Sequence, residues 1–296
     1  MKYVVTGSLG HISQPLAEQL VQAGHNVTLI SSNPDKTAAI EALGATAAIG
    51  SVEDPAFLAN AFTGADAVYT MVPPFWGSPN WKQQIATVGE HYAAAIKAAG
   101  VKYVVNLSSV GTHMPAGCGP VSGLFYVEQA LDALEGVQVK HLRPGFFYYN
   151  FLNNAGMVKH MHIIGGNYGP DTKLVLADTQ DIAEVAAEAL LHLSFTGKSY
   201  AYIVSDERTT HEVAQVLGQA VGKPDLAWVD FPDDATLVAM LQNGLPEENA
   251  KNYTEMGAAI RSGEMFSDYR QQAVANLGKT KLEAFAPLFA AAYNQA

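Results

Sequence analysis

The segment Lys2-Tyr3-Val4-Val5-Thr6-Gly7-Ser8-Leu9-Gly10-His11-Ile12-Ser13 decides the fold of this chain. Its β-branched start predicts a strand, and residues 15–21 have helical spacing. A glycine-rich turn between a first strand and a first helix lets the backbone approach a pyrophosphate at the helix N-terminus. We therefore expect a dinucleotide to bind here, in contact with Gly7, Ser8, Gly10, His11 and Ile12. The pattern Gly-x-x-Gly-x-x-Ser is not the full Gly-x-Gly-x-x-Gly motif, so a turn without a ligand is the alternative.

Outward from this segment, short apolar runs alternate with helical patterns, which is typical of βαβ units around a parallel sheet. The predicted strands are residues 2–6, 26–31, 46–49, 67–71, 103–107 and 139–142. The predicted helices begin near Ile12, Pro34, Asp54, Pro79 and Ser122. This pattern predicts the α/β class, with a doubly wound parallel Rossmann sheet.

The alternation stops after Pro144, and the remaining pattern is mostly helical. We expect an NAD(P)-binding Rossmann domain over residues 1–150 and a smaller, mainly helical C-terminal lobe over residues 151–296. One helix and one strand within residues 179–204 are expected to return to the Rossmann sheet. This lobe would bind a substrate or a partner.

Composition narrows the classes of function. Among the 296 residues, 49% are hydrophobic and 15% charged, which predicts a globular core. The net charge of -11 disfavours nucleic acid as a partner. Cys118 is the single cysteine, and the sequence contains neither a signal-peptide pattern nor a membrane-length apolar run, so we expect a cytoplasmic protein without membrane association.

The end of the second predicted strand bears on the choice of cofactor. Dinucleotide folds place an acidic residue here when they bind the ribose 2′-OH, but this chain has Ser31-Ser32-Asn33-Pro34-Asp35-Lys36. Ser32 and Asn33 could donate hydrogen bonds to a 2′-phosphate, and Lys36 could supply charge, which favours NADPH over NADH. Alternatively, these residues only cap the helix that Pro34 opens.

Further strand ends are expected at the same edge of the sheet. Met71, Val72 and Pro73 would flank the cofactor there. An aromatic wall suited to a flat substrate is expected from Phe75, Trp76, Phe147 and Tyr149. The alternative is that these aromatic residues close the interface between the lobes.

These motifs together resemble the NmrA-like branch of the atypical short-chain dehydrogenase/reductases. The resemblance rests on the Gly7–Ser13 turn, Ser32-Asn33-Pro34-Asp35-Lys36, Leu107-Ser108-Ser109, Leu142-Arg143-Pro144-Gly145-Phe146-Phe147-Tyr148-Tyr149-Asn150 and the run from Ser205 to Ala214. It implies an NAD(P)-binding Rossmann domain with a substrate cleft beside a small C-terminal lobe. We expect Ser108, Pro144 and Phe146, which lie in these motifs, to contact the cofactor.

The resemblance also indicates which catalytic residues to look for. Reductases of the wider superfamily use Tyr with Lys four residues later, but Tyr126 is followed by Ala130, and no other tyrosine has that lysine. Hydride transfer to a quinone or a similar small electrophile needs no such pair, because the acceptor can take protons from water. Ser108 and Tyr126 are the catalytic candidates, and Ser108 could equally serve local backbone hydrogen bonds.

Two functions follow from these residues. The first is an NAD(P)H-dependent oxidoreductase that reduces quinones or similar electrophiles. The alternative is a non-catalytic redox sensor that binds NADP(H) and acts through a protein partner, and a homodimer is also left open. No metal site is predicted, because His160 and His162 have no recognisable third ligand, and the role of Cys118 is left open.

Overall fold

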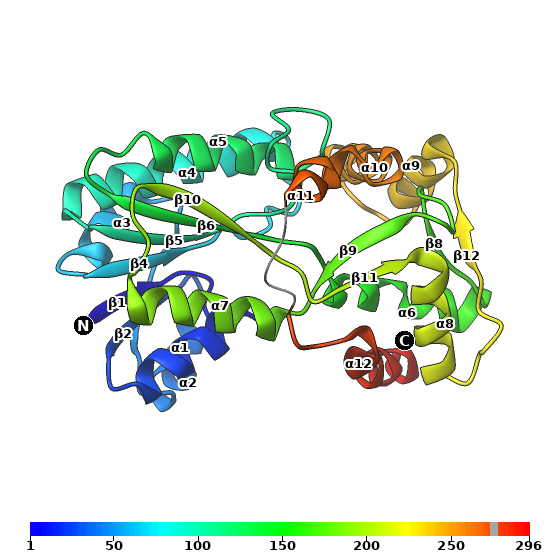
Figure 1. The fold of residues 1–296 in the computed structure, drawn as a ribbon, viewed down its shortest axis with the longest axis horizontal. Coiled ribbons are helices and arrows are strands. Elements are labelled where there is room, and N and C mark those ends of the chain that lie inside the picture. The colour runs from blue at the N-terminus through cyan, green and yellow to red at the C-terminus, as the bar shows by residue number, and fades with distance from the viewer. Residues whose placement is uncertain (273–277) are drawn as a thin grey trace.

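The computed structural model describes residues 1–272 and 278–296, and within these ranges its largest element is a seven-stranded sheet (Figure 1). The strand order is β10-β6-β5-β4-β1-β2-β3, and all neighbouring strands are parallel. The strands are β1 (Lys2–Val5), β2 (Asn26–Ser31), β3 (Thr46–Ile49), β4 (Ala67–Thr70), β5 (Tyr103–Leu107), β6 (Gln138–Pro144) and β10 (Lys198–Ile203). The predicted doubly wound parallel sheet is confirmed.

Helices cover both faces of this sheet because its strands are apolar on both sides. In β1, Tyr3 and Val5 belong to one buried cluster and Val4 to another. The first cluster is covered by α1 (Ser13–Gln22), α2 (Thr37–Ala42) and α7 (Thr179–His192), and the second by α3 (Pro55–Phe62), α4 (Trp81–Ala99) and α5 (Val121–Asp132). Figure 1 shows these two groups of helices on opposite sides of the sheet.

The strand order reverses direction at β1, whose neighbours are β2 and β4. Open α/β sheets bind ligands outside the carboxyl ends of their strands at such a switch point. The glycine-rich turn follows the carboxyl end of β1, so the topology places it at this crevice.

The C-terminal part of the chain is mainly helical, as predicted, with two small sheets. Its strands are β7 (Phe146–Phe147), β9 (Lys173–Ala177) and β11 (Asp206–Thr209) in one sheet, and β8 (Ile164–Gly166) and β12 (Trp228–Asp230) in the other. The helices are α6 (Ala155–Met161), α8 (Thr210–Ala220), α9 (Asp233–Gln242), α10 (Glu247–Ser262), α11 (Ser267–Gln271) and α12 (Leu282–Gln295). Three 3-10 helices, η1 (Pro34–Lys36), η2 (Tyr148–Asn154) and η3 (Glu264–Phe266), complete the elements of the described residues.

A separate core holds this second part together. Trp228, Phe266, Phe285 and Phe289 are buried in one cluster that joins β12, η3 and α12. Between β9 and β11 of this second part, the chain passes through α7 to β10, which pairs with β6 in the large sheet. The large sheet therefore contains a strand from beyond residue 150.

Among the residues that the structure describes, none of the helices combines the length and the hydrophobicity that a membrane span requires.

Candidate functional site

The glycine-rich turn has a backbone that larger residues could not adopt. Gly7 has a φ of +97°, and a Cβ atom there would lie 2.3 Å from the Ser13 hydroxyl oxygen. A Cβ atom at Gly10 would lie 2.9 Å from the Gly7 carbonyl oxygen. Both glycines are therefore needed for a tight turn whose backbone stays accessible.

Hydrogen bonds fix this turn to the neighbouring strands. Ser8 adopts the left-handed region with a φ of +54°, its N–H donates to the Ile30 carbonyl at 3.0 Å, and its hydroxyl donates to Ser31 Oγ at 2.9 Å. On the other side, the Met71 N–H donates to Thr6 Oγ1 at 2.8 Å. The turn is thus held between the carboxyl ends of β2 and β4.

The first turn of α1 fits an anionic group. The structure records no side-chain cap at Ile12 and no acidic residue in the first turn of α1. The Gln14 N–H donates to the Gly10 carbonyl at 3.0 Å and Pro15 has no N–H, so this helix end offers a ligand the Ser13 N–H and the positive end of the helix dipole. A cavity of about 580 Å³ lies against this helix end. The residues present fit a phosphate-bearing ligand.

Many of the predicted cofactor and substrate residues line this cavity. They come from the glycine-rich turn, the ends of β2 and β4, and the segment that follows β6: Gly7, Ser8, Gly10, His11, Ile12, Ser32, Met71, Pro73, Phe75, Phe147 and Tyr149. Residues far apart in the sequence thus meet at the switch point.

The lining also contains residues that the sequence analysis did not assign to the site. Ser51, Val52 and Glu53 follow β3, and Asn150 and Thr179 come from η2 and the start of α7. The order of the parallel strands is the signal that could have found the first three. Because β3 lies beside β2, its carboxyl end shares the edge at which Ser32 was placed.

Other predicted residues lie outside the lining. Val72, Asn33, Lys36, Pro144 and Phe146 are absent from it among the residues described. Lys36 is exposed in η1, and Phe146 packs against Phe151 with a ring distance of 5.3 Å. Their contacts with a cofactor stay predictions.

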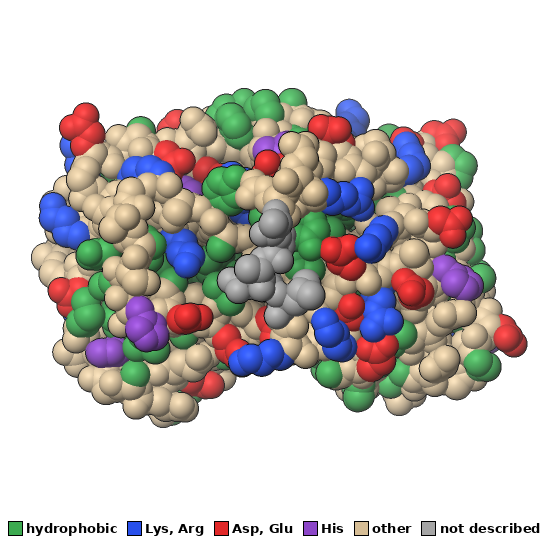
Figure 2. Space-filling view, in the orientation of Figure 1, with side chains coloured by type: hydrophobic (Ala, Val, Ile, Leu, Met, Phe, Trp, Pro, Cys, Tyr) green, Lys and Arg blue, Asp and Glu red, His purple; other side chains and the backbone are tan. Residues whose placement is uncertain are grey.

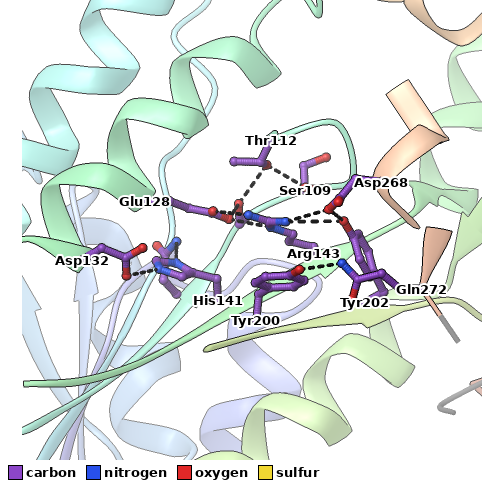
Figure 3. A network of polar contacts seen from close by, with 12 residues as sticks. Ser109, Thr112, Glu128, Asp132, His141, Arg143, Tyr200, Tyr202, Asp268 and Gln272 are labelled. Carbon is purple, nitrogen blue, oxygen red and sulfur yellow. Dashed lines mark hydrogen bonds and ion pairs between the residues drawn. The ribbon is translucent and has the colours of Figure 1, made fainter. Parts of the chain in front are cut away.

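Ser108, a predicted catalytic residue, is buried and does not line the cavity either. Its hydroxyl donates to Glu128 Oε1 at 2.5 Å, and Glu128 forms a 2.6 Å ion pair with Arg143 (Figure 3). Because the serine proton is committed to a carboxylate, this hydroxyl is not free to donate to a substrate carbonyl in the structure. The alternative stated for Ser108, local hydrogen bonds to the backbone, also differs from this geometry, because the hydroxyl contacts the side chains of Glu128 and Thr112. A catalytic role for Ser108 stays a prediction.

Tyr126 and Trp76 also lie away from the cavity lining. Tyr126 is 48% exposed on α5, where its ring meets Phe125 edge-on. Trp76 is 60% exposed and stacks on Tyr253 of α10, with ring centroids 6.0 Å apart. The aromatic wall of the cavity therefore consists of Phe75, Phe147 and Tyr149.

The single cysteine, Cys118, has a thiol of low reactivity. Cys118 is buried, and burial, together with the negative charge of Glu255, raises the pKa of its thiol to about 12. A thiol with such a pKa is a poor nucleophile at neutral pH.

One feature of the lining connects the glycine-rich turn to η2. The imidazole of His11 stacks on the ring of Tyr149, with centroids 3.8 Å apart and planes inclined by 35°. Both residues line the cavity. This pair therefore lies beside the start of α1, where a phosphate group would bind.

The fold and this cavity define a Rossmann-type protein whose glycine-rich turn lines a cavity at the switch point of the sheet. The sequence model of the NmrA-like family matches residues 2–286. The chain belongs to that family.

Two curated proteins are similar over most of their length. The NAD(P)H azoreductase of Xenophilus azovorans is 28% identical over 259 residues, covering 86% of each chain. The (4-alkanoyl-5-oxo-2,5-dihydrofuran-3-yl)methyl phosphate reductase of Streptomyces griseus is 26% identical over 260 residues, covering 88% of this chain and 87% of that protein.

Solved structures share the fold. An NADPH-dependent quinone oxidoreductase from Escherichia coli, in complex with NADPH, superposes with a TM-score of 0.81 at 23% identity, covering 96% of this chain and 98% of its own. The Citrobacter sp. triphenylmethane reductase, in complex with NADP(H), has a TM-score of 0.79 at 20% identity, covering 97% and 99%.

Proposed function

We propose that this protein is an NAD(P)H-dependent reductase of small, flat electrophiles such as quinones. The observation that carries the proposal is a single cavity that joins the glycine-rich turn, the end of β2 and the aromatic side chains of Phe75, Phe147 and Tyr149. The names of the two curated relatives support a reductase, and the name of the Xenophilus azovorans azoreductase supports NAD(P)H as its reductant. The names of the E. coli and Citrobacter structures agree.

Different residues of the cavity would bind the cofactor and the acceptor. Gly7 and Gly10 give a phosphate access to the backbone, and the start of α1 supplies the Ser13 N–H and the positive end of the helix dipole. A bound NAD(P)H would supply the hydride. Phe75, Phe147 and Tyr149 would hold a planar acceptor against it. Since Ser108 donates to Glu128, we assign no side-chain acid, and the reduced acceptor takes its protons from water.

NADPH is the reductant that we favour. Ser32 lines the cavity at the end of β2, and Asn33 and Lys36 follow in the next turn of the chain. Hydroxyl, amide and ammonium groups suit a 2′-phosphate, and an acidic residue that would bind a free ribose 2′-OH is missing at this strand end. We also place the protein in the cytoplasm, where a single buried thiol remains reduced.

The second candidate is a sensor that binds NADP(H) and acts through a protein partner. Two observations favour it over an enzyme with a side-chain acid: the sequence has no Tyr-Lys pair, and the Ser108 hydroxyl is occupied by Glu128. The first candidate requires a small-molecule acceptor and no partner protein. The enzyme would act alone or as a homodimer.

Steady-state oxidation of NADPH with a panel of quinones and azo dyes separates the two candidates. NADP⁺ binding is first measured by calorimetry on the same preparation. We expect saturable turnover with at least one planar acceptor. Tight cofactor binding without turnover across the panel favours the sensor, and a lack of any dinucleotide binding excludes both.

A further inference from the structure

The cavity offers little positive charge to a ligand that carries phosphates. Among the described residues of its lining, the ionisable side chains are those of His11, Glu53 and Tyr149, and neither lysine nor arginine occurs. The whole chain carries a net charge of -11, so long-range electrostatics oppose the approach of an anion. Backbone N–H groups and a single histidine are the local sources of positive potential in this lining.

His11 is placed to act on a phosphate at the start of α1. It directly precedes Ile12, the N-cap residue of that helix, and follows Gly10 in the turn. Tyr149 holds its imidazole over the cavity through the 3.8 Å ring stack.

We propose that protonated His11, held by Tyr149, is the cation that pairs with the pyrophosphate of the dinucleotide. This inference rests on the proposed function, because it names a residue of the same cofactor site. Tyr149 is thereby a positioning residue for His11, in addition to lining the cavity for a substrate.

Two other ionisable side chains, those of Glu53 and Tyr149, line the same cavity as His11. Glu53 is the carboxylate in the lining, and its Oε1 accepts a 2.7 Å hydrogen bond from Gln84 Nε2 of α4. Tyr149 comes from η2, and its ring is the one stacked on the imidazole. Histidine gains its charge as pH falls between about 8 and 5, so an imidazolium–phosphate pair strengthens binding on the acid side of this window. On the alkaline side, only the backbone donors and the helix dipole remain.

Calorimetric titration with NADP⁺ at pH 6.0 and pH 8.0 tests the proposal. The variants are His11→Gln, which keeps a hydrogen-bonding side chain without the charge, and His211→Gln, a matched control at an exposed position of α8 outside the cavity lining. The quantity compared is the ratio of the variant Kd to the wild-type Kd at each pH. Titration of the 2′-phosphate of NADP⁺ itself affects all variants equally and cancels in this ratio.

For His11→Gln we expect a ratio of about 3 to 10 at pH 6.0 and close to one at pH 8.0, since a charge-assisted hydrogen bond at a partly exposed site contributes about 1 kcal/mol. The ratio for His211→Gln stays close to one at both pH values. Tyr149→Leu, which removes the stacked ring, reduces the difference between the two pH values.

The possible results separate this inference from the proposed function. Wild-type binding of NADP⁺ with an equal ratio for His11→Gln at both pH values overturns the role of His11 and leaves the reductase proposal intact. If wild-type protein binds NADP⁺ at neither pH, the cofactor site and the role of His11 are both overturned.

Discussion

At the scale of single residues, the glycine-rich turn makes the sharpest prediction. Replacing Gly10 with valine should abolish NADP⁺ binding. The new Cβ atom would lie 2.9 Å from the Gly7 carbonyl oxygen, and its two methyl groups would occupy space at the start of α1. Calorimetric titration measures the loss.

Gly156 provides the matched control, because a Cβ atom there meets no described atom within 4 Å. Gly156→Val should leave the Kd for NADP⁺ unchanged. Wild-type affinity in Gly10→Val would show that the dinucleotide does not bind at this turn.

Lys36 makes a second prediction at the same scale. Lys36→Glu should weaken NADPH binding about tenfold more than NADH binding, since it replaces attraction to the 2′-phosphate by repulsion at an exposed site. The Kd values of both nucleotides, obtained from nucleotide fluorescence, give this ratio. Equal losses for the two nucleotides would mean that Lys36 does not contact the 2′-phosphate.

At the scale of secondary-structure elements, a buried ion-pair network connects the sheet to the C-terminal part (Figure 3). Arg143 of β6 pairs with Glu128 of α5 at 2.6 Å and with Asp268 of α11 at 3.1 Å. Burial lowers the pKa of this guanidinium, but the hydrogen bonds and charge of Glu128 outweigh it and raise the pKa above its ordinary value. Arg143 therefore remains charged and holds two carboxylates from different parts of the chain.

Removing this arginine should destabilise the protein. Arg143→Met leaves the buried Glu128 without its counter-ion, and the loss in the free energy of unfolding should be about 3–5 kcal/mol. Urea denaturation followed by circular dichroism measures it. The exposed pair Lys251–Glu247 is the control, because Lys251→Met at a solvent-exposed site should change stability by less than about 1 kcal/mol.

A double variant distinguishes loss of the counter-ion from loss of packing. Adding Glu128→Met to Arg143→Met removes the unpaired carboxylate, so part of the lost stability should return. Additive losses in the two single variants would show that the pair contributes through packing alone.

The elements also show what the sequence predicted and what it did not. The strands β1, β2 and β5 of the large sheet are mostly buried, rich in β-branched residues and separated by helical patterns, so their existence was evident from local periodicity. The strands β8 and β12 have three residues each, and β7 has two. Such strands are defined by partners far away in the sequence, and no local pattern indicates them.

In the candidate site, too, residues near a recognisable strand were predictable, whereas contacts with residues far away in the sequence were not. Gly7, Gly10 and Ser32, which line the cavity, were predicted because each lies in the turn that follows a recognisable strand. The position of Ser108 was predicted at the end of β5, but its partner Glu128 lies 20 residues further on in α5. Only the packing of α5 against β6 and Arg143 brings that carboxylate to the Ser108 hydroxyl.

At the scale of the whole molecule, charge governs how the cofactor approaches. Acidic residues number 28 and basic residues 17, and the face in Figure 2 shows both kinds interspersed. The cofactor is also an anion. At pH 8, where histidine is largely neutral, the net interaction at long range is therefore repulsive.

Added salt should consequently strengthen NADP⁺ binding at pH 8. The Debye length falls from about 30 Å at 0.01 M to about 8 Å at 0.15 M, so distant negative charges are screened while contacts within the cavity are not. We expect the association rate constant to rise about threefold over this range, which stopped-flow fluorescence with NADPH measures. A rate that falls with salt would instead reveal a local positive potential at the cavity mouth, supplied by residues outside its lining such as Lys36. The same salt series with Lys36→Glu then shows whether Lys36 is the source of this potential. If Lys36 attracts the cofactor, the association rate constant of the variant rises with salt where that of the wild type falls.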